Sequence, residues 1–113
     1  MNATDFELNI SLPADARFAK AMRDLAAHAA RYAGGREQDV ERYGAAVERV
    51  VIACLDRAPA GAPVLVILRR GAGPVEFLIG CESRTDAAAH DAGIAVGWTR
   101  EQGTPMCRVA LDL

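Results

Sequence analysis

The chain has 113 residues, with 13 lysines and arginines against 15 aspartates and glutamates, for a formal net charge of −2. Hydrophobic residues make up 51% and charged residues 25%, a balance that excludes an intrinsically disordered chain. The slight negative charge argues against a nucleic-acid-binding protein, which usually carries a basic surface. Domains typically have about 100–150 residues, so we expect one domain over residues 1–113.

The start of the chain has neither a basic segment nor a long apolar run, so no signal peptide is expected. The longest uninterrupted apolar run, residues 64–68, is far shorter than the roughly 20 residues that span a membrane. The three cysteines include no CxxC pair and are expected to be reduced and buried. These features predict a cytoplasmic protein with no membrane contact.

The first predicted element is a strand over residues 6–12, in which apolar and polar residues alternate strictly. Pro13 ends it, since proline cannot donate to a sheet ladder. Apolar residues then recur at steps of three and four over residues 14–33, which predicts an amphipathic helix that ends at the glycines 34–35. A second helix is predicted over residues 37–57. The expected apolar stripe of the first helix consists of Phe18, Met22, Leu25, Ala29 and Tyr32.

Four strands are predicted to follow the helices, as two hairpins formed by residues 64–69 with 75–81 and by residues 94–99 with 106–113. The stretch 82–93 is expected to be a loop or a short helix. Segregated helices and strands of this kind predict an α+β fold. We expect a two-layer α/β sandwich, with two main helices packed on one face of a mixed, mostly antiparallel sheet of about five strands.

The middle strands are apolar on both faces, which a two-layer fold does not explain. Residues 64–68 and 77–79 do not alternate, although the outer face of such a sheet should meet water. Either another part of the chain or another chain covers that face. A homodimer through the sheet face is therefore one prediction. The alternative is that single aliphatic side chains are tolerated on the surface.

Few residues suggest chemistry. The two histidines, His28 and His90, have no ligand partner three or four residues away, so no metal site is predicted. Cys81, at the end of a predicted strand, is the most suggestive nucleophile, with His90 as its base, but an inert thiol is the simpler interpretation. The glycines at 71 and 73 do not precede a helix, which favours a hairpin turn over a phosphate-binding loop.

One carboxylate lies within an otherwise apolar stretch of the second predicted helix. Glu48 closes the segment Ala45-Ala46-Val47-Glu48. Taken alone, Glu48 is expected to be a solvated residue or the ion-pair partner of Arg42 or Arg49.

Several segments follow one another in a familiar order: a strand over 6–12 that ends in a proline, a helix that ends in glycine, the Ala-Ala-Val-Glu stretch of 45–48, the hairpin of 64–81 and a closing Gly-Thr segment over 103–109. Together they resemble the anti-sigma-factor serine-kinase branch of the histidine-kinase-like (GHKL) ATPase family. The resemblance implies the histidine-kinase-like ATPase fold, a bacterial regulatory role and a sigma factor or an antagonist protein as partner. It also places Glu48 at the position of the family's general base.

The nucleotide-binding positions of that family are substituted here. The resemblance places Ile52 where the family has the asparagine that helps hold Mg²⁺, and Cys81 and Ser83 where it has an aspartate and a glycine at the adenine. The segment 84–93, in the place of the glycine-rich lid, is short and holds one glycine. Phosphoryl transfer depends on positioning and charge neutralisation, so Glu48 alone cannot supply it.

We therefore expect a degenerate family member: a non-catalytic regulatory domain that binds another protein and uses no nucleotide, other cofactor or metal. Glu48 would be catalytic only if nucleotide binds. One alternative is a small enzyme or ligand-binding domain with a site near Cys81, and another is an active ATP-dependent serine kinase. An unrelated two-layer domain could reach the same order of elements.

Overall fold

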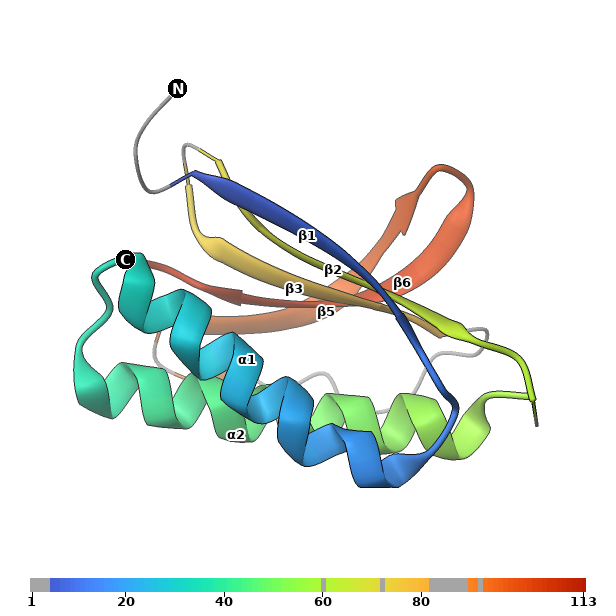
Figure 1. The fold of residues 1–113 in the computed structure, drawn as a ribbon. Helices are drawn as coiled ribbons and strands as arrows, with labels where there is room; N and C mark the ends of the chain where they lie inside the picture. The colour runs from blue at the N-terminus through green and yellow to red at the C-terminus, as the bar shows by residue number, and fades with distance from the viewer. Residues whose placement is uncertain (1–4, 60, 72, 82–89, 92) are drawn as a thin grey trace.

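The computed structural model describes residues 5–59, 61–71, 73–81, 90–91 and 93–113. Two helices pack on one face of an antiparallel sheet, which confirms the predicted α+β sandwich (Figure 1). The elements in chain order are β1 (Phe6–Leu12), a short 3-10 helix η1 (Ala16–Phe18), α1 (Ala19–Tyr32), α2 (Glu37–Arg57), β2 (Val64–Arg70), β3 (Val75–Gly80), β4 (His90–Asp91), β5 (Ile94–Glu101) and β6 (Thr104–Leu111).

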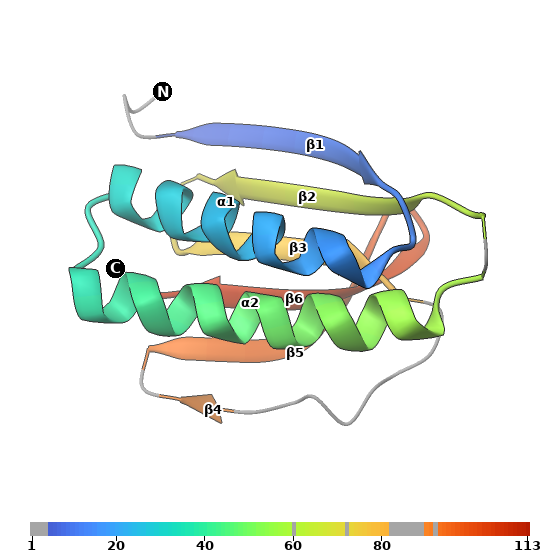
Figure 2. The ribbon, with the colours of Figure 1, turned by 60° about the horizontal axis from the view of Figure 1, so that its bottom comes forward.

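The sheet has the strand order β1-β2-β3-β6-β5-β4, and all the pairs that the structure describes are antiparallel. Figure 2 shows α1 and α2 lying side by side across this sheet. β1 forms one edge and the two-residue β4 the other. Most of the stretch expected to be a loop or short helix, residues 82–89 and 92, lies outside the described residues.

The first helix buries the middle of the predicted stripe but not its ends. Met22 and Ala29 are buried and Leu25 packs against the core, but Phe18 and Tyr32, at the two ends, are exposed. The physical reason is the close contact between α1 and α2. At that contact Gly44 of α2 lies against α1, where an added Cβ would come within 3.2 Å of the Cγ atom of Arg23. Such an approach favours small residues, and the buried positions of α1 are Ala19, Met22, Ala26, Ala29 and Ala30.

The core between the two layers is aliphatic, with one phenol hydroxyl inside it. Tyr43 of α2 is fully buried and donates hydrogen bonds to the backbone carbonyls of Val109 at 2.9 Å and Val75 at 3.4 Å. This links the second helix to β6 and β3 in the middle of the sheet. The other large, fully buried side chains include Val40, Val47, Val51, Val66, Leu68, Phe77, Ile79 and Leu111.

The outer face of the sheet carries a second, smaller apolar cluster. Ile67, Leu78 and Met106 are buried there, although no helix packs on this side among the described residues. In Figure 1 the far end of the β5–β6 hairpin rises on the side away from the helices. From that end Glu101 accepts a hydrogen bond from Arg69 of β2.

Charged side chains close this outer cluster. Glu76 of β3 accepts hydrogen bonds from Arg69, at 3.2 Å, and from Arg108 of β6. The chain itself therefore buries Ile67 and Leu78, two of the apolar positions on which the prediction of a dimer through the sheet face was based. Leu65 of β2 stays 40% exposed on this face, and a homodimer here stays a prediction.

Candidate functional site

One end of the core brings together all three cysteines from separate parts of the chain. Cys54 lies on α2, Cys81 directly follows β3, and Cys107 lies on β6. All three are buried, as predicted, and none is in a disulfide. Since Ile79 pairs with Cys107, and the backbone N–H of Cys81 donates to the Pro105 carbonyl at 3.1 Å, the two strand cysteines are diagonal neighbours on the ladder.

The thiols of this cluster interact directly. The hydrogen bond that links Cys54 and Cys107, together with burial, raises the pKa of Cys54 far above its ordinary value. The same hydrogen bond lowers the pKa of Cys107. Cys54 also makes a side-chain hydrogen bond with Cys81. Cys54 is therefore the thiol that links the other two, and it ionises less readily than Cys107.

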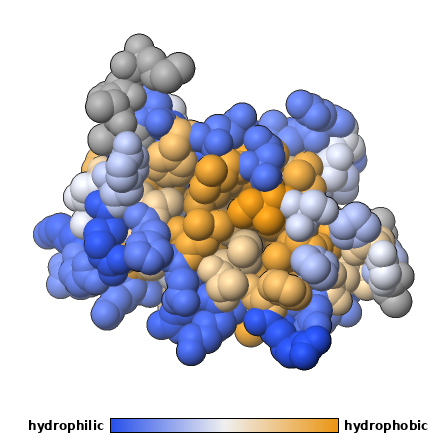
Figure 3. Space-filling view, viewed as in Figure 1, coloured by the Kyte–Doolittle hydropathy of each residue, from blue (hydrophilic) through white to orange (hydrophobic). Residues whose placement is uncertain are grey.

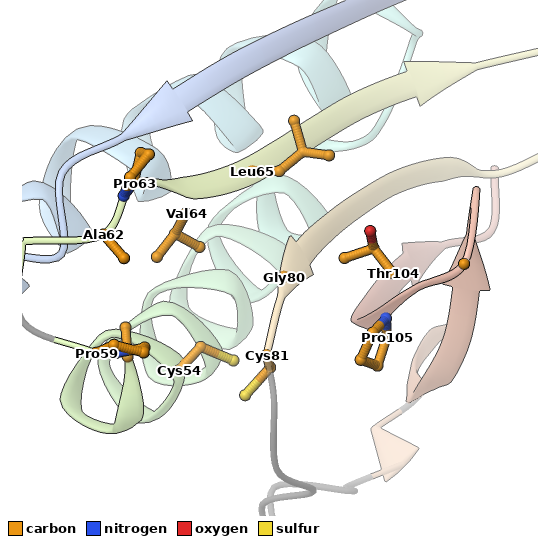
Figure 4. A pocket seen from close by; sticks show the side chains of 12 residues that line it. Cys54, Pro59, Ala62, Pro63, Val64, Leu65, Gly80, Cys81, Thr104 and Pro105 are labelled. Atoms are coloured by element: carbon orange, nitrogen blue, oxygen red, sulfur yellow. The ribbon is translucent and has the colours of Figure 1, made fainter.

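A pocket of about 330 Å³ borders this cluster. In Figure 4 the side chain of Cys54 points from α2 toward Cys81, and both residues line the pocket. The remaining lining comes from the turns and the ends of β2, β3 and β6 on this side, and it is mostly apolar: Ala58, Pro59, Ala62, Pro63, Val64, Leu65, Gly80, Gly103, Thr104 and Pro105. Such a lining suits a small, largely apolar molecule, since it offers few polar groups to orient a charged one.

The structure places Glu48 elsewhere, between the two helices. Its carboxylate accepts a hydrogen bond from Arg23 of α1, with 2.9 Å between Nη1 and Oε1. The sequence predicted a solvated residue or an ion pair within α2, with Arg42 or Arg49. The partner observed here comes instead from the neighbouring helix, which only the packing of α1 against α2 brings close.

The side chain of Ile52 points away from the cysteine cluster. It is 41% exposed, whereas Cys54, two positions later on α2, faces the sheet. Side chains two positions apart on a helix point to different sides. Ile52, and Glu48 one helical turn before it, therefore lie on a different side of α2 from Cys54. Ser83, the third substituted position of the family resemblance, lies outside the described residues.

Of the two histidines, the structure describes the side chain of His28 alone. His28 is exposed on α1, and His90 belongs to the short strand β4, where only its backbone is described. Among the described residues, no group of three or more histidines, cysteines, aspartates and glutamates is arranged to hold a metal ion. Among the described side chains, none is therefore identified as a base for Cys81.

The structure also has an exposed apolar surface beside β1, which the sequence did not predict. We call it the edge strip and define it by Leu8, Phe18 and Tyr32, which are 44%, 39% and 60% exposed. Phe6, at the start of β1, contacts Tyr32 edge-on with 6.0 Å between ring centroids, so α1 runs back along β1. Figure 3 shows apolar side chains gathered at the centre of this face, where β1 and α1 lie in front.

The local pattern could not reveal the edge strip because two of its members fit the predicted core stripe of α1. Only the strand order shows that β1 is an edge strand with no further strand beside it in the described sheet.

Comparisons with known proteins give no match from which a function could be inferred. No protein-family model matches the chain, and no curated protein matches it either. None of the helices in the described residues has the length and apolar character needed to cross a membrane.

Proposed function

We propose that the chain is a non-catalytic regulatory domain that acts by binding another protein, as a degenerate member of the anti-sigma-factor branch of the GHKL family. The observation that carries this proposal is the edge strip. Three large side chains, of Leu8 on β1 and of Phe18 and Tyr32 at the two ends of the first helix, are exposed, and β1 has no further strand beside it in the described sheet. Apolar patches of this kind mark interaction sites, and a sheet edge can also bind a partner through its backbone.

The surroundings of two family positions support a role without nucleotide. Glu48 is held by Arg23 in an ion pair between the helices, and Ile52 offers an exposed hydrocarbon surface in place of an amide oxygen. By resemblance, the partner is a sigma factor or an antagonist protein, and the location is the cytoplasm. Both stay predictions.

Affinity capture from native extract tests the proposal with two matched variants. Leu8→Arg places a charge in the edge strip, whereas Leu65→Arg places it on the neighbouring strand, at a leucine of similar exposure on the opposite face. We expect the wild-type chain and Leu65→Arg to retain a protein partner that Leu8→Arg loses. Recovery of no partner by the wild-type chain, or equal recovery by both variants, would contradict the proposal.

A second candidate function rests on the pocket beside Cys54 and Cys81, as a binding or reaction site for a small apolar molecule. A thiol-reactive probe separates the two functions. Selective labelling of Cys81 in the folded chain at neutral pH would favour the small-molecule site, because reactive cysteines have depressed pKa values. Under the main proposal we expect the three buried thiols to react only when the chain unfolds.

A further inference from the structure

We propose that Cys54 and Cys81 form a reversible disulfide when a small organic hydroperoxide enters the pocket that both residues line. The proposal adds an oxidation site to the protein-binding role and does not depend on that role. It concerns the pair of thiols rather than Cys81 alone, so it is also distinct from a labelling or binding site in the same pocket.

The three cysteines of the chain meet at one end of the core, although they come from three separate elements. Cys54 and Cys81 line the pocket, whereas Cys107 is not part of its lining. Figure 4 shows the side chain of Cys54 pointing from α2 toward Cys81 at the end of β3. The hydrogen bond between these two thiols keeps their sulfur atoms within reach of each other. An oxidant in the pocket therefore meets a pair of thiols that the fold has already assembled.

The geometry selects this pair among the three cysteines. Cys81 and Cys107 are diagonal neighbours on adjacent strands, a relation that separates two residues by about 7–8 Å, at or beyond the limit for a disulfide. Cys54 and Cys107 are each 1% exposed, whereas Cys81 is 6% exposed. The raised pKa of Cys54 also disfavours its thiolate, although it lines the same pocket. Cys81 is thus the thiol that the oxidant meets first, and Cys54 is its partner.

Each disulfide consumes one hydroperoxide. The sulfur of Cys81, as the thiolate, attacks the terminal oxygen of the hydroperoxide, and the O–O bond breaks. The leaving alkoxide takes up the proton lost by the thiol, which gives an alcohol and a sulfenic acid at Cys81. The sulfur of Cys54 then attacks the sulfur of Cys81, the S–O bond breaks, and hydroxide leaves with the Cys54 proton as water. The two thiols lose two electrons in total, which reduce the hydroperoxide.

The pocket lining favours an organic hydroperoxide as oxidant and a disulfide as product. Its volume of about 330 Å³ and its mostly apolar side chains suit a small hydrocarbon group beside the reactive oxygen. Burial disfavours charged groups, so it opposes further oxidation of Cys81 to an anionic sulfinate, whereas the disulfide is neutral.

Protection of the same thiols from an alkylating probe is compatible with this oxidation. Such a probe leaves its whole body on the sulfur atom, for which side chains at most 6% exposed leave little room. A hydroperoxide leaves a single oxygen atom on Cys81, and the disulfide leaves none.

Peptide mapping of the oxidised wild-type chain tests the pair. Trypsin cleaves after lysine and arginine and places the three cysteines on separate peptides, 50–57, 71–84 and 101–108. The folded chain is treated with tert-butyl hydroperoxide, and its remaining thiols are then blocked in urea before digestion. We expect peptides 50–57 and 71–84 to be linked, and dithiothreitol to release them. A dominant link to 101–108, unreacted thiols or a sulfinic acid in place of the link overturns the proposal.

Matched variants separate the contributions of the three thiols. Cys107→Ala should still form the disulfide, whereas Cys54→Ala and Cys81→Ala should not. Circular dichroism checks that each variant is folded, and the mapping of the wild-type chain decides the pair without any variant. Loss of the disulfide in a folded Cys107→Ala chain overturns the assignment.

A comparison of two oxidants tests the class of hydroperoxide. The rates of thiol loss with tert-butyl hydroperoxide and with hydrogen peroxide are measured in the folded chain and in urea. We expect the ratio of the two rates to be at least about fourfold higher in the folded chain, the factor that corresponds to burial of one methylene-sized group. An equal ratio would show that the pocket does not select the organic group and would overturn that class. None of these outcomes alters the expected loss of the protein partner in Leu8→Arg, so failure here and failure of the proposed function are distinguishable.

Discussion

Tyr43 places a hydroxyl group inside an otherwise apolar core, where its hydrogen bonds become part of the fold. Tyr43→Phe removes the donor to the Val109 carbonyl, 2.9 Å away, and keeps the ring. We expect the free energy of unfolding to fall by about 1 kcal/mol, the usual net value of one such hydrogen bond. Urea denaturation measures the change. An unchanged stability of Tyr43→Phe would contradict the assigned hydrogen bond.

The same residue predicts a loss of stability at alkaline pH. Burial raises the pKa of Tyr43 well above its ordinary value. The unfolded chain therefore releases this proton near pH 10 while the folded chain keeps it, so stability is full below about pH 10 and falls above it. The slope reaches up to about 1.4 kcal/mol per pH unit. Cys54 contributes in the same direction to both chains, so the difference between wild type and Tyr43→Phe isolates the tyrosine. Identical alkaline profiles would exclude its role.

At the scale of elements, the contact between the two helices depends on one glycine. A Cβ atom at Gly44 would lie 3.2 Å from Cγ and 3.3 Å from the carbonyl oxygen of Arg23. Gly44→Val should push α1 from α2 and lower the free energy of unfolding by about 1–3 kcal/mol, despite the better helix propensity of valine. Gly71→Val, in a turn where an added Cβ meets nothing within 4 Å, is the control. Equal stability of the two variants would show that the helices can separate freely.

On the outer sheet face, Glu76 joins β2, β3 and β6. Burial opposes ionisation of this carboxylate, but the hydrogen bonds from Arg108 and Arg69 outweigh it and lower the pKa of Glu76. Its contribution to stability is thus present above about pH 4.5, the ordinary pKa region, and is lost as the pH falls through the lowered value. We expect Glu76→Gln to cost about 1–2 kcal/mol at pH 7 and to lose less stability than wild type on acidification. Parallel acid profiles in urea would contradict this.

The sequence predicted elements better than contacts, because elements depend on neighbours in the chain. Strict alternation and Pro13 located the strand 6–12, and the glycines at 34–35 located the end of the first helix. The start of that helix came later than expected because Ala16–Phe18 forms a 3-10 turn. The Arg23–Glu48 pair, the meeting of the cysteines and the exposed edge of β1 depend on which strands and helices become neighbours. No local pattern carries that information.

At the scale of the whole molecule, the two layers give the three positions of the family resemblance that the structure describes different surroundings. Cys81 ends β3 within the core, beside Cys54 on the sheet-facing side of α2. Ile52 is on another side of the same helix, and Glu48, one turn earlier, already has a partner on α1. Val47, Val51 and Cys54, each at most 1% exposed, fix the side of α2 that faces the core.

The exposure of Ile52 predicts the outcome of placing there the asparagine that the family resemblance implies. Titration calorimetry with millimolar ATP or ADP and Mg²⁺ should give no binding heat with the wild-type chain. Ile52→Asn supplies the amide that the family uses for Mg²⁺, yet it should stay silent as well, since the new side chain would face solvent away from Cys81. Ile52→Ala is the matched control for loss of the isoleucine. Micromolar binding by the wild-type chain would instead make Glu48 a catalytic candidate, and a kinase assay would then test the serine-kinase alternative. Binding gained only by Ile52→Asn would contradict the expected silence of this variant and show that α2 can present this side to a nucleotide.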